Sequence, residues 1–142
     1  MSEQIHLRIG AEPWLPADTA KLDKVVNHYD VPLAGIIQQH RKYYLFECLD
    51  GHGSDSNLWA YAEISRSERR EILRTRGAAE LQKLFTRILR SRSFTAAVAI
   101  DHGLEMAALV EHQRDRAPVK AATTAISLKA DSVRAIDVLA TC

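Results

Sequence analysis

Acidic residues and a histidine gather in one short, glycine-containing segment, residues 50–55. Its sequence is Asp-Gly-His-Gly-Ser-Asp, and carboxylate oxygens and imidazole nitrogens are common ligands of divalent metals. A catalytic metal centre needs about three protein ligands, and further candidates follow a different apolar run, near residue 101. The same residue types are ordinary turn formers, so the segment predicts a loop first and a metal site second. The candidate metal ligands are His52, Asp55, Asp101 and His102, with Asp50 beside them.

Nucleophilic catalysis has weaker support. Cys48 lies in the apolar run of residues 43–49, where burial raises the pKa of a thiol and keeps the sulfur unreactive. Ser54, Ser65 and Ser67 lack the strand-turn-helix setting of a hydrolase nucleophile. The sequence therefore predicts no catalytic residue and no cofactor, and it favours a non-enzymatic protein.

Positive charge is concentrated between Arg66 and Arg92. This segment has nine basic and three acidic residues, a balance of +6, whereas the rest of the chain has ten basic and fifteen acidic residues, a balance of −5. The basic residues recur at helical spacing, and guanidinium groups pair with carboxylate or phosphate. We predict that two cationic helix faces form one exposed partner-binding surface, consisting of Arg66, Arg70, Arg74, Lys83, Arg87 and Arg90.

The helices that carry this surface begin where the apolar period changes from two residues to nearly four, after Ile64. Ser65 and Glu68 have the spacing of a capping box, which predicts a helix to about Arg74. A longer amphipathic helix is predicted over residues 78–91. Its buried residues should be Leu81, Leu84, Phe85, Ile88 and Leu89.

Strands are indicated on both sides of these helices. Residues 33–37 and 43–49 are β-prone and flank a polar stretch, and a third such run at 58–64 predicts an antiparallel meander. The continuous apolar run at 94–100 predicts another buried strand. Strict alternation at residues 4–9 predicts a short edge strand.

A helix is also predicted before the meander, over residues 18–29, because its apolar residues share one helical face. They are Leu22, Val25, Val26 and Tyr29. The preceding segment, 10–16, contains glycine and two prolines, so we expect an ordered loop in which Trp14 covers the core.

The C-terminal third has mixed signals. Residues 104–111 are predicted as a short helix, 113–120 as a linker because of Pro118 and several charges, and 121–128 as extended chain. Asp131 is predicted to cap a last helix. The apolar residues of that helix would be Val133, Ile136, Val138 and Leu139.

The elements predict an α+β fold, with an antiparallel sheet of four to five strands around a central meander. An amphipathic helical pair would cover the sheet, with additional N- and C-terminal helices. Residues 1–116 would form the compact domain, and residues 117–142 a linker and helical tail docked on the domain or on a partner. The chain has 142 residues, of which 46% are hydrophobic and 26% are charged. This length and composition are typical of a globular protein. With two cysteines, no signal peptide and no apolar span, we expect a cytoplasmic protein.

We therefore expect a small non-enzymatic interaction module, of a regulatory, immunity or accessory kind, that binds a protein partner through the Arg-rich face. Homo-oligomers are compatible with this, and no membrane partner is expected. One alternative is a nucleic-acid-binding protein, although the pI is about 7.9 and the usual binding motifs are absent. The other is a metal-dependent phosphodiesterase or nuclease that uses the Asp/His loop.

Overall fold

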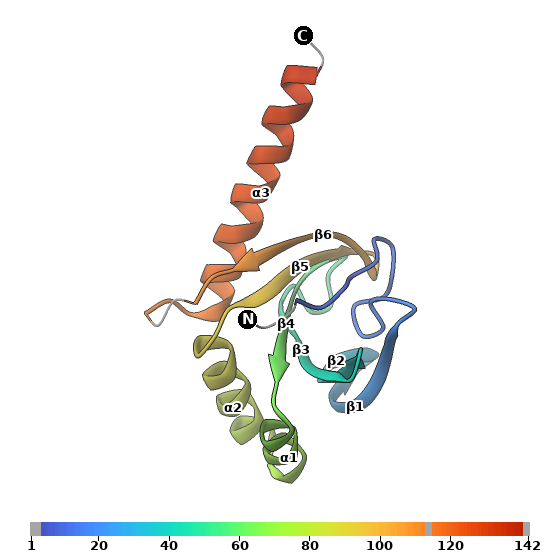
Figure 1. Cartoon of the computed structure of the whole chain (residues 1–142), viewed down its shortest axis with the longest axis vertical. Helices are drawn as coiled ribbons and strands as arrows, with labels where there is room; N and C mark the ends of the chain where they lie inside the picture. Colours follow the sequence, from blue (N-terminus) through green and yellow to red (C-terminus); the bar gives the residue numbers. More distant parts are fainter. Residues whose placement is uncertain (1–3, 113–114, 141–142) are drawn as a thin grey trace.

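The computed structural model describes residues 4–112 and 115–140, with the backbone alone for 133–140. Within these residues the chain forms four strands, then two helices, then two more strands and a last helix (Figure 1). The strands are β1 (Ala20–Tyr29), β2 (Val31–Gln39), β3 (Lys42–Asp50), β4 (Ser56–Ile64), β5 (Phe94–Ile100) and β6 (Gly103–Val110). The helices are α1 (Arg66–Arg74), α2 (Ala78–Arg90) and α3 (Pro118–Ala140).

The strands form one antiparallel sheet in chain order, β1-β2-β3-β4-β5-β6. The prediction of four to five strands is therefore wrong, because two segments predicted as helices, 18–29 and 104–111, form the edge strands β1 and β6. The meander itself, β2 to β4, is confirmed, and so is β5. The helical pair α1–α2 is inserted between β4 and β5, which are adjacent in the sheet.

Both faces of the central strands are buried, and each has its own cover. Leu45 of β3 packs with residues of α1 and α2 such as Ile72 and Phe85. The next residue, Phe46, faces the opposite side and packs with Trp59 of β4. Side chains alternate along a strand, so β3 and β4 separate a helix-side core from a second core beneath the N-terminal segment.

The N-terminal segment covers the second core without forming a strand, which corrects the edge strand predicted at residues 4–9. Ile5 is buried there, and the predicted loop places Trp14 against Trp59, with ring centroids 6.3 Å apart. The side chain of Gln39 accepts from the His6 N–H and donates to the His6 carbonyl. An extended chain laid on a sheet alternates as a strand does, which explains the misleading pattern.

β1 replaces the helix predicted over residues 18–29. Its pairing with β2 shifts register between Leu22 and Lys24 and again between Val25 and Asn27. Each bulge adds a residue and interrupts the two-residue alternation, so the apolar spacing imitates a helix face. These two shifts fall at Asp23 and Val26, and a third follows between Asn27 and His28. Asp23 accepts a hydrogen bond from Arg69 of α1, and Val26 packs on the helix-side core.

β6 replaces the short helix predicted over residues 104–111. It follows β5 through the two-residue turn Asp101-His102, in which both residues have positive φ. That conformation matches the twist of a tight hairpin, so β6 pairs directly with β5 despite its helix-forming alanines. His40 and Arg41 join β2 and β3 with the same signs of φ.

The two central helices agree with their sequence signals. The Ser65 side chain accepts from the Glu68 N–H, and the Glu68 carboxylate accepts from the Ser65 N–H, which is the predicted capping box. Of the predicted apolar stripe of α2, four residues are buried and Leu81 is partly buried. Leu81 differs from the other four because it lines a cleft beside α2.

α3 is a single helix that includes the residues predicted as extended, 121–128. Pro118 is its first residue, where a missing N–H costs nothing, so the proline marks a helix start within the predicted linker. Ala121 and Ala122 are buried in the helix-side core, and the helix then extends beyond the sheet (Figure 1). Asp131 lies inside the helix, so it is not the predicted cap. The side chains predicted to be apolar at 133, 136, 138 and 139 lie outside the described residues.

In the described part of the chain, no helix combines the length and apolar character needed to cross a bilayer.

Gly35 of β2 has no room for a side chain. A Cβ there would lie 2.1 Å from the Lys24 carbonyl oxygen and 2.9 Å from the Phe46 ring. We expect Gly35→Ala to destabilise the fold by about 2 kcal/mol or more, because backbone must move. Gly103→Ala is the matched control, with a nearest contact of 3.5 Å, and should change stability by less than about 0.5 kcal/mol. Urea unfolding measures the free energy of unfolding of both variants. Equal losses would contradict the close approach of Lys24 and Phe46 to Gly35.

Candidate functional site

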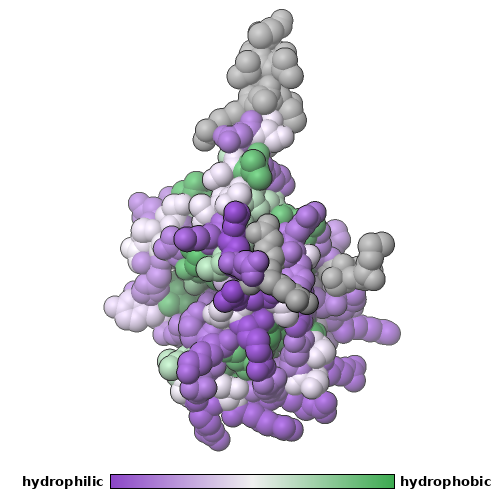
Figure 2. Space-filling view, turned by 90° about the vertical axis from the view of Figure 1, so that its left-hand side faces the viewer, coloured by the Kyte–Doolittle hydropathy of each residue, from purple (hydrophilic) through white to green (hydrophobic). Residues whose placement is uncertain are grey.

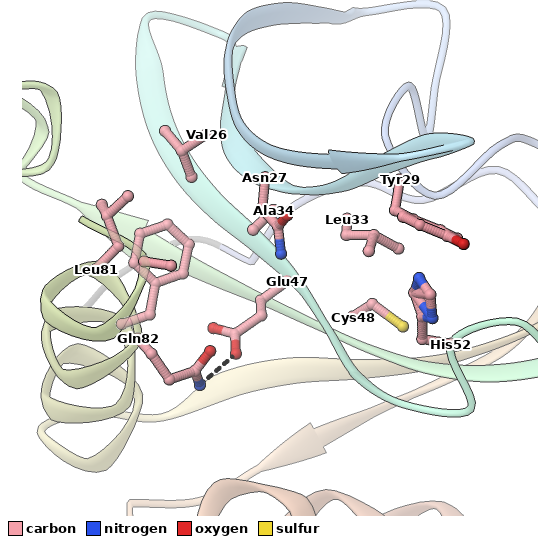
Figure 3. A pocket seen from close by; sticks show the side chains of 12 residues that line it. Val26, Asn27, Tyr29, Leu33, Ala34, Glu47, Cys48, His52, Leu81 and Gln82 are labelled. Atoms are coloured by element: carbon pink, nitrogen blue, oxygen red, sulfur yellow. Dashed lines mark hydrogen bonds between the residues drawn. The ribbon is translucent and has the colours of Figure 1, made fainter. Parts of the chain in front are cut away.

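A cleft of about 450 Å³ opens between α2 and the ends of β1, β2 and β3 (Figure 3). Its inner part is lined by apolar side chains of both layers, and its outer part lies beside the β3–β4 loop. The volume is in the range of small-molecule sites. Its lining includes Val26, Tyr29, Leu33, Glu47, Cys48, His52, Ala78, Leu81, Gln82 and Phe85.

Strand register explains why there is space at this place. Glu47 of β3 lies opposite Ala34 of β2 on one side and Ala60 of β4 on the other. Two alanines leave the surface around the carboxyl group unfilled, and α2 covers it only in part. The cleft therefore follows from small neighbours across the sheet.

Glu47 is the chemically distinctive residue of the cleft. It is 7% exposed, and its Oε1 accepts a hydrogen bond from Gln82 Nε2 at 3.0 Å. Its Oε2 is buried with no hydrogen-bond partner among the described residues. Burial raises the pKa of this carboxyl group, and the bond from Gln82 only partly opposes the rise.

Aromatic rings and a thiol line the outer part of the cleft. The rings of Tyr29 and His52 are 5.0 Å apart between centroids, and Figure 3 shows both beside Cys48. The Cys48 thiol donates to the Asp50 carbonyl, and burial raises its pKa to about 11. At neutral pH the sulfur is therefore a protonated, weakly nucleophilic group.

A smaller cavity of about 240 Å³ adjoins the cleft and shares Tyr29 and Cys48 with it. His52, Asp55 and His102, three of the four predicted metal ligands, line this cavity. The Asp101 backbone N–H donates to the Asp55 carbonyl at 2.8 Å, which holds the two loops together.

Within residues 4–112 and 115–140, no group of three or more His, Cys, Asp or Glu side chains is close enough to hold a metal ion. The two histidines of the smaller cavity contact aromatic rings instead: His52 lies by Tyr29, and His102 lies 5.8 Å from Trp14 between centroids. Asp101 and His102 form a tight hairpin turn. The geometry gives the metal hypothesis no ligand set.

The predicted cationic surface divides between its two helices. On α2, Lys83 lies 3.6 Å from Glu80, and Arg87 donates to Glu71 of α1 at 2.7 Å. Arg90 is exposed at the end of the same helix. These contacts connect α2 to itself and to α1, so much of its charge is locally compensated.

On α1, by contrast, Arg66, Arg70 and Arg74 are exposed and form no ion pair with any described residue. Both carboxylates of the helix are already engaged, Glu68 by Arg92 and Glu71 by Arg87. The hydrogen bonds from Arg92 are the largest cause that lowers the pKa of Glu68.

Glu47 and Gln82 are not among the site residues predicted from the sequence. A signal was present, because Glu47 is the single charged residue in the apolar run at 43–49. A carboxylate in a strand buried on both faces is rare unless it is paired. Gln82 bonds Oε1 of this carboxylate, and Oε2 has no partner among the described residues. Both facts depend on residues far along the chain, which local patterns do not contain.

Comparisons of this chain with protein-family models, curated proteins and solved structures find no match.

Glu47 should make stability depend on pH. An unfolded glutamate titrates near pH 4.3, as an approximate value, and the folded pKa is higher. Between these two values the folded state binds more protons than the unfolded state, so this group's contribution to stability falls as pH rises. We expect Glu47→Gln to be the more stable protein above the folded pKa and to lose that advantage toward about pH 4. Urea unfolding across this range measures the difference, and an advantage that is independent of pH would refute the assignment.

Cys48 should resist alkylation in the folded protein. With a pKa of about 11, its thiolate fraction near neutral pH is on the order of a hundredfold below that of an unfolded cysteine. In a Cys142→Ser background, iodoacetamide should therefore modify the native protein roughly a hundredfold more slowly than the urea-unfolded chain. Mass spectrometry over time gives both rates. Equal rates would show that the thiol is not held protonated by burial.

Proposed function

We propose that this chain is a non-enzymatic interaction module that binds an acidic protein through the arginine row of α1. The row is defined as Arg66, Arg70 and Arg74. The observation that carries the proposal is that these three guanidinium groups are exposed and have no acidic partner among the described residues.

Spacing makes the row a single feature. Residues four apart lie on one helix face, and like charges at that spacing destabilise an isolated helix by about 0.2–0.5 kcal/mol per pair. The two carboxylates that could offset this repulsion are bonded to Arg87 and Arg92. A row of carboxylates on a partner would remove the repulsion and form bidentate pairs.

An apolar group lies on the same side. Leu73 is 41% exposed, and its helical position falls beside Arg66 and Arg70. Partner interfaces combine such apolar contacts with arginine. Figure 2 shows a largely hydrophilic surface at the end of the molecule where α1 and α2 lie.

The extent of the row favours a protein over a nucleic acid. It covers the nine residues of α1 from Arg66 to Arg74, so its two ends are about 12 Å apart along the helix. Lys83 and Arg87 of α2 are engaged by carboxylates. A nucleic-acid backbone calls for a longer continuous basic surface. A short acidic helix or segment of a protein matches the row better.

The ion pair of Arg87 changes the role proposed for α2. Its bond to Glu71 joins α2 to α1, so Arg87 positions the row. We further infer a cytoplasmic location, supported by the free thiol of Cys48.

Charge reversal tests the proposal. Partners retained by the immobilised protein are identified and purified, and their Kd is then measured by calorimetry. We expect Arg70→Glu with Arg74→Glu to weaken that Kd about tenfold or more, because attraction becomes repulsion. Lys21→Glu with Lys24→Glu makes the same charge change on exposed β1 positions and should leave Kd unchanged.

Two results would contradict the proposal. One is an equal Kd for the α1 double variant and the unaltered protein. The other is tight, steeply salt-dependent binding to double-stranded DNA that the α1 variant abolishes, which would assign the row to nucleic acid.

A further inference from the structure

We propose that the cleft between α2 and β1–β3 binds a small molecule with one protonated amine on an apolar body, and that the amine pairs with Glu47. This site is separate from the arginine row of α1 and does not depend on the function proposed for it.

The position of the Glu47 carboxyl group suits a contact with a ligand bound in the cleft. Glu47 lines the cleft. Its Oε1 accepts a hydrogen bond from Gln82 at 3.0 Å, while its Oε2 is buried without a partner among the described residues. Figure 3 shows the side chain extending toward α2 inside the cleft. A buried polar atom without a partner costs free energy, and a donor bound in the cleft would remove that cost.

The lining selects the charge and character of the ligand. Among the residues that the structure describes, no lysine or arginine lines the cleft, so an anionic ligand would meet Glu47 without a compensating cation. Leu81 and Phe85 of α2 and Val26 of β1 supply apolar surface. Tyr29, which is 64% exposed, provides an aromatic ring at the outer part of the cleft.

The number of free acceptors favours an ammonium over a guanidinium or a metal ion. A guanidinium fork needs both carboxylate oxygens, and Gln82 already occupies Oε1. A metal ion needs further ligands, and the described residues hold no such group. An ammonium is a point donor that a single oxygen can satisfy.

Binding of an amine should also change the protonation of Glu47. Burial raises the pKa of the free carboxyl group, and a neighbouring cation lowers it again. An arriving ammonium therefore favours the ionised form and expels any proton that the carboxyl carries.

The test uses 2-phenylethylamine as the probe, with 2-phenylethanol and 3-phenylpropionic acid as ligands of matched size. Calorimetry near neutral pH should detect binding of the amine, and the alcohol and the acid should bind about tenfold or more weakly. Glu47→Gln should weaken amine binding by about tenfold or more. Glu105→Gln removes an exposed carboxylate on β6 and should bind the amine as the unaltered protein does.

A second variant separates loss of the site from loss of the fold. Ala78 is an exposed residue that lines the cleft, so Ala78→Trp should fill the cleft, leave Glu47 in place and abolish amine binding while far-UV circular dichroism is unchanged. Arg70→Glu with Arg74→Glu should bind the amine normally, which distinguishes this site from the arginine row. Equal affinity for the amine and the acid, full affinity in Glu47→Gln, or no amine binding at millimolar concentration would each overturn the proposal.

Discussion

Burial of β3 and β4 on both faces is the constraint that organises this protein. Phe46 and Trp59 face one side, and Leu45 faces the other, so a single layer of helices cannot cover the sheet. The helices α1, α2 and the start of α3 cover one face, and the N-terminal segment covers the second. The buried Tyr61 hydroxyl donates to the Pro13 carbonyl at 2.6 Å, which ties that segment to the sheet and satisfies a polar group that burial would otherwise penalise.

The same constraint gives Glu47 its chemistry. If this face of the strand were in water, the carboxylate of Glu47 would be hydrated, and burial would not raise its pKa. In β3 it faces the helix-side layer, where alanines across the sheet leave a space that α2 does not fill. Gln82 satisfies one carboxylate oxygen. The cleft and its acidic group therefore have a single origin, which is the combination of a doubly buried strand with small neighbours.

Sequence patterns predicted those elements whose local signal agrees with their final pairing. The meander, the capping box at Ser65 and the stripe of α2 are of this kind. They failed where a tertiary feature altered the period: bulges in β1 placed its apolar residues at helical spacing, and the hairpin turn at Asp101 paired a segment rich in helix formers. The arginines of the candidate surface were visible in the sequence, but their pairing was not, because Arg87 meets Glu71 across two helices. Glu47 was visible as a charge in an apolar run. That only one of its two carboxylate oxygens is hydrogen-bonded depends on α2, which supplies Gln82.

The exposed arginine row of α1 and the buried Oε2 of Glu47 differ in their energetic cost. Like charges on an exposed helix cost about 0.2–0.5 kcal/mol per pair, and salt screens them. A buried polar atom without a partner costs about 1–3 kcal/mol, and salt screens it little. Both are large enough to matter in a fold whose net stability is on the order of 10 kcal/mol. The larger cost is at Glu47, where replacement by an apolar side chain of similar volume would remove it. A ligand that bonds Glu47 in the cleft would therefore remove a larger free-energy cost than a partner that pairs with the arginine row.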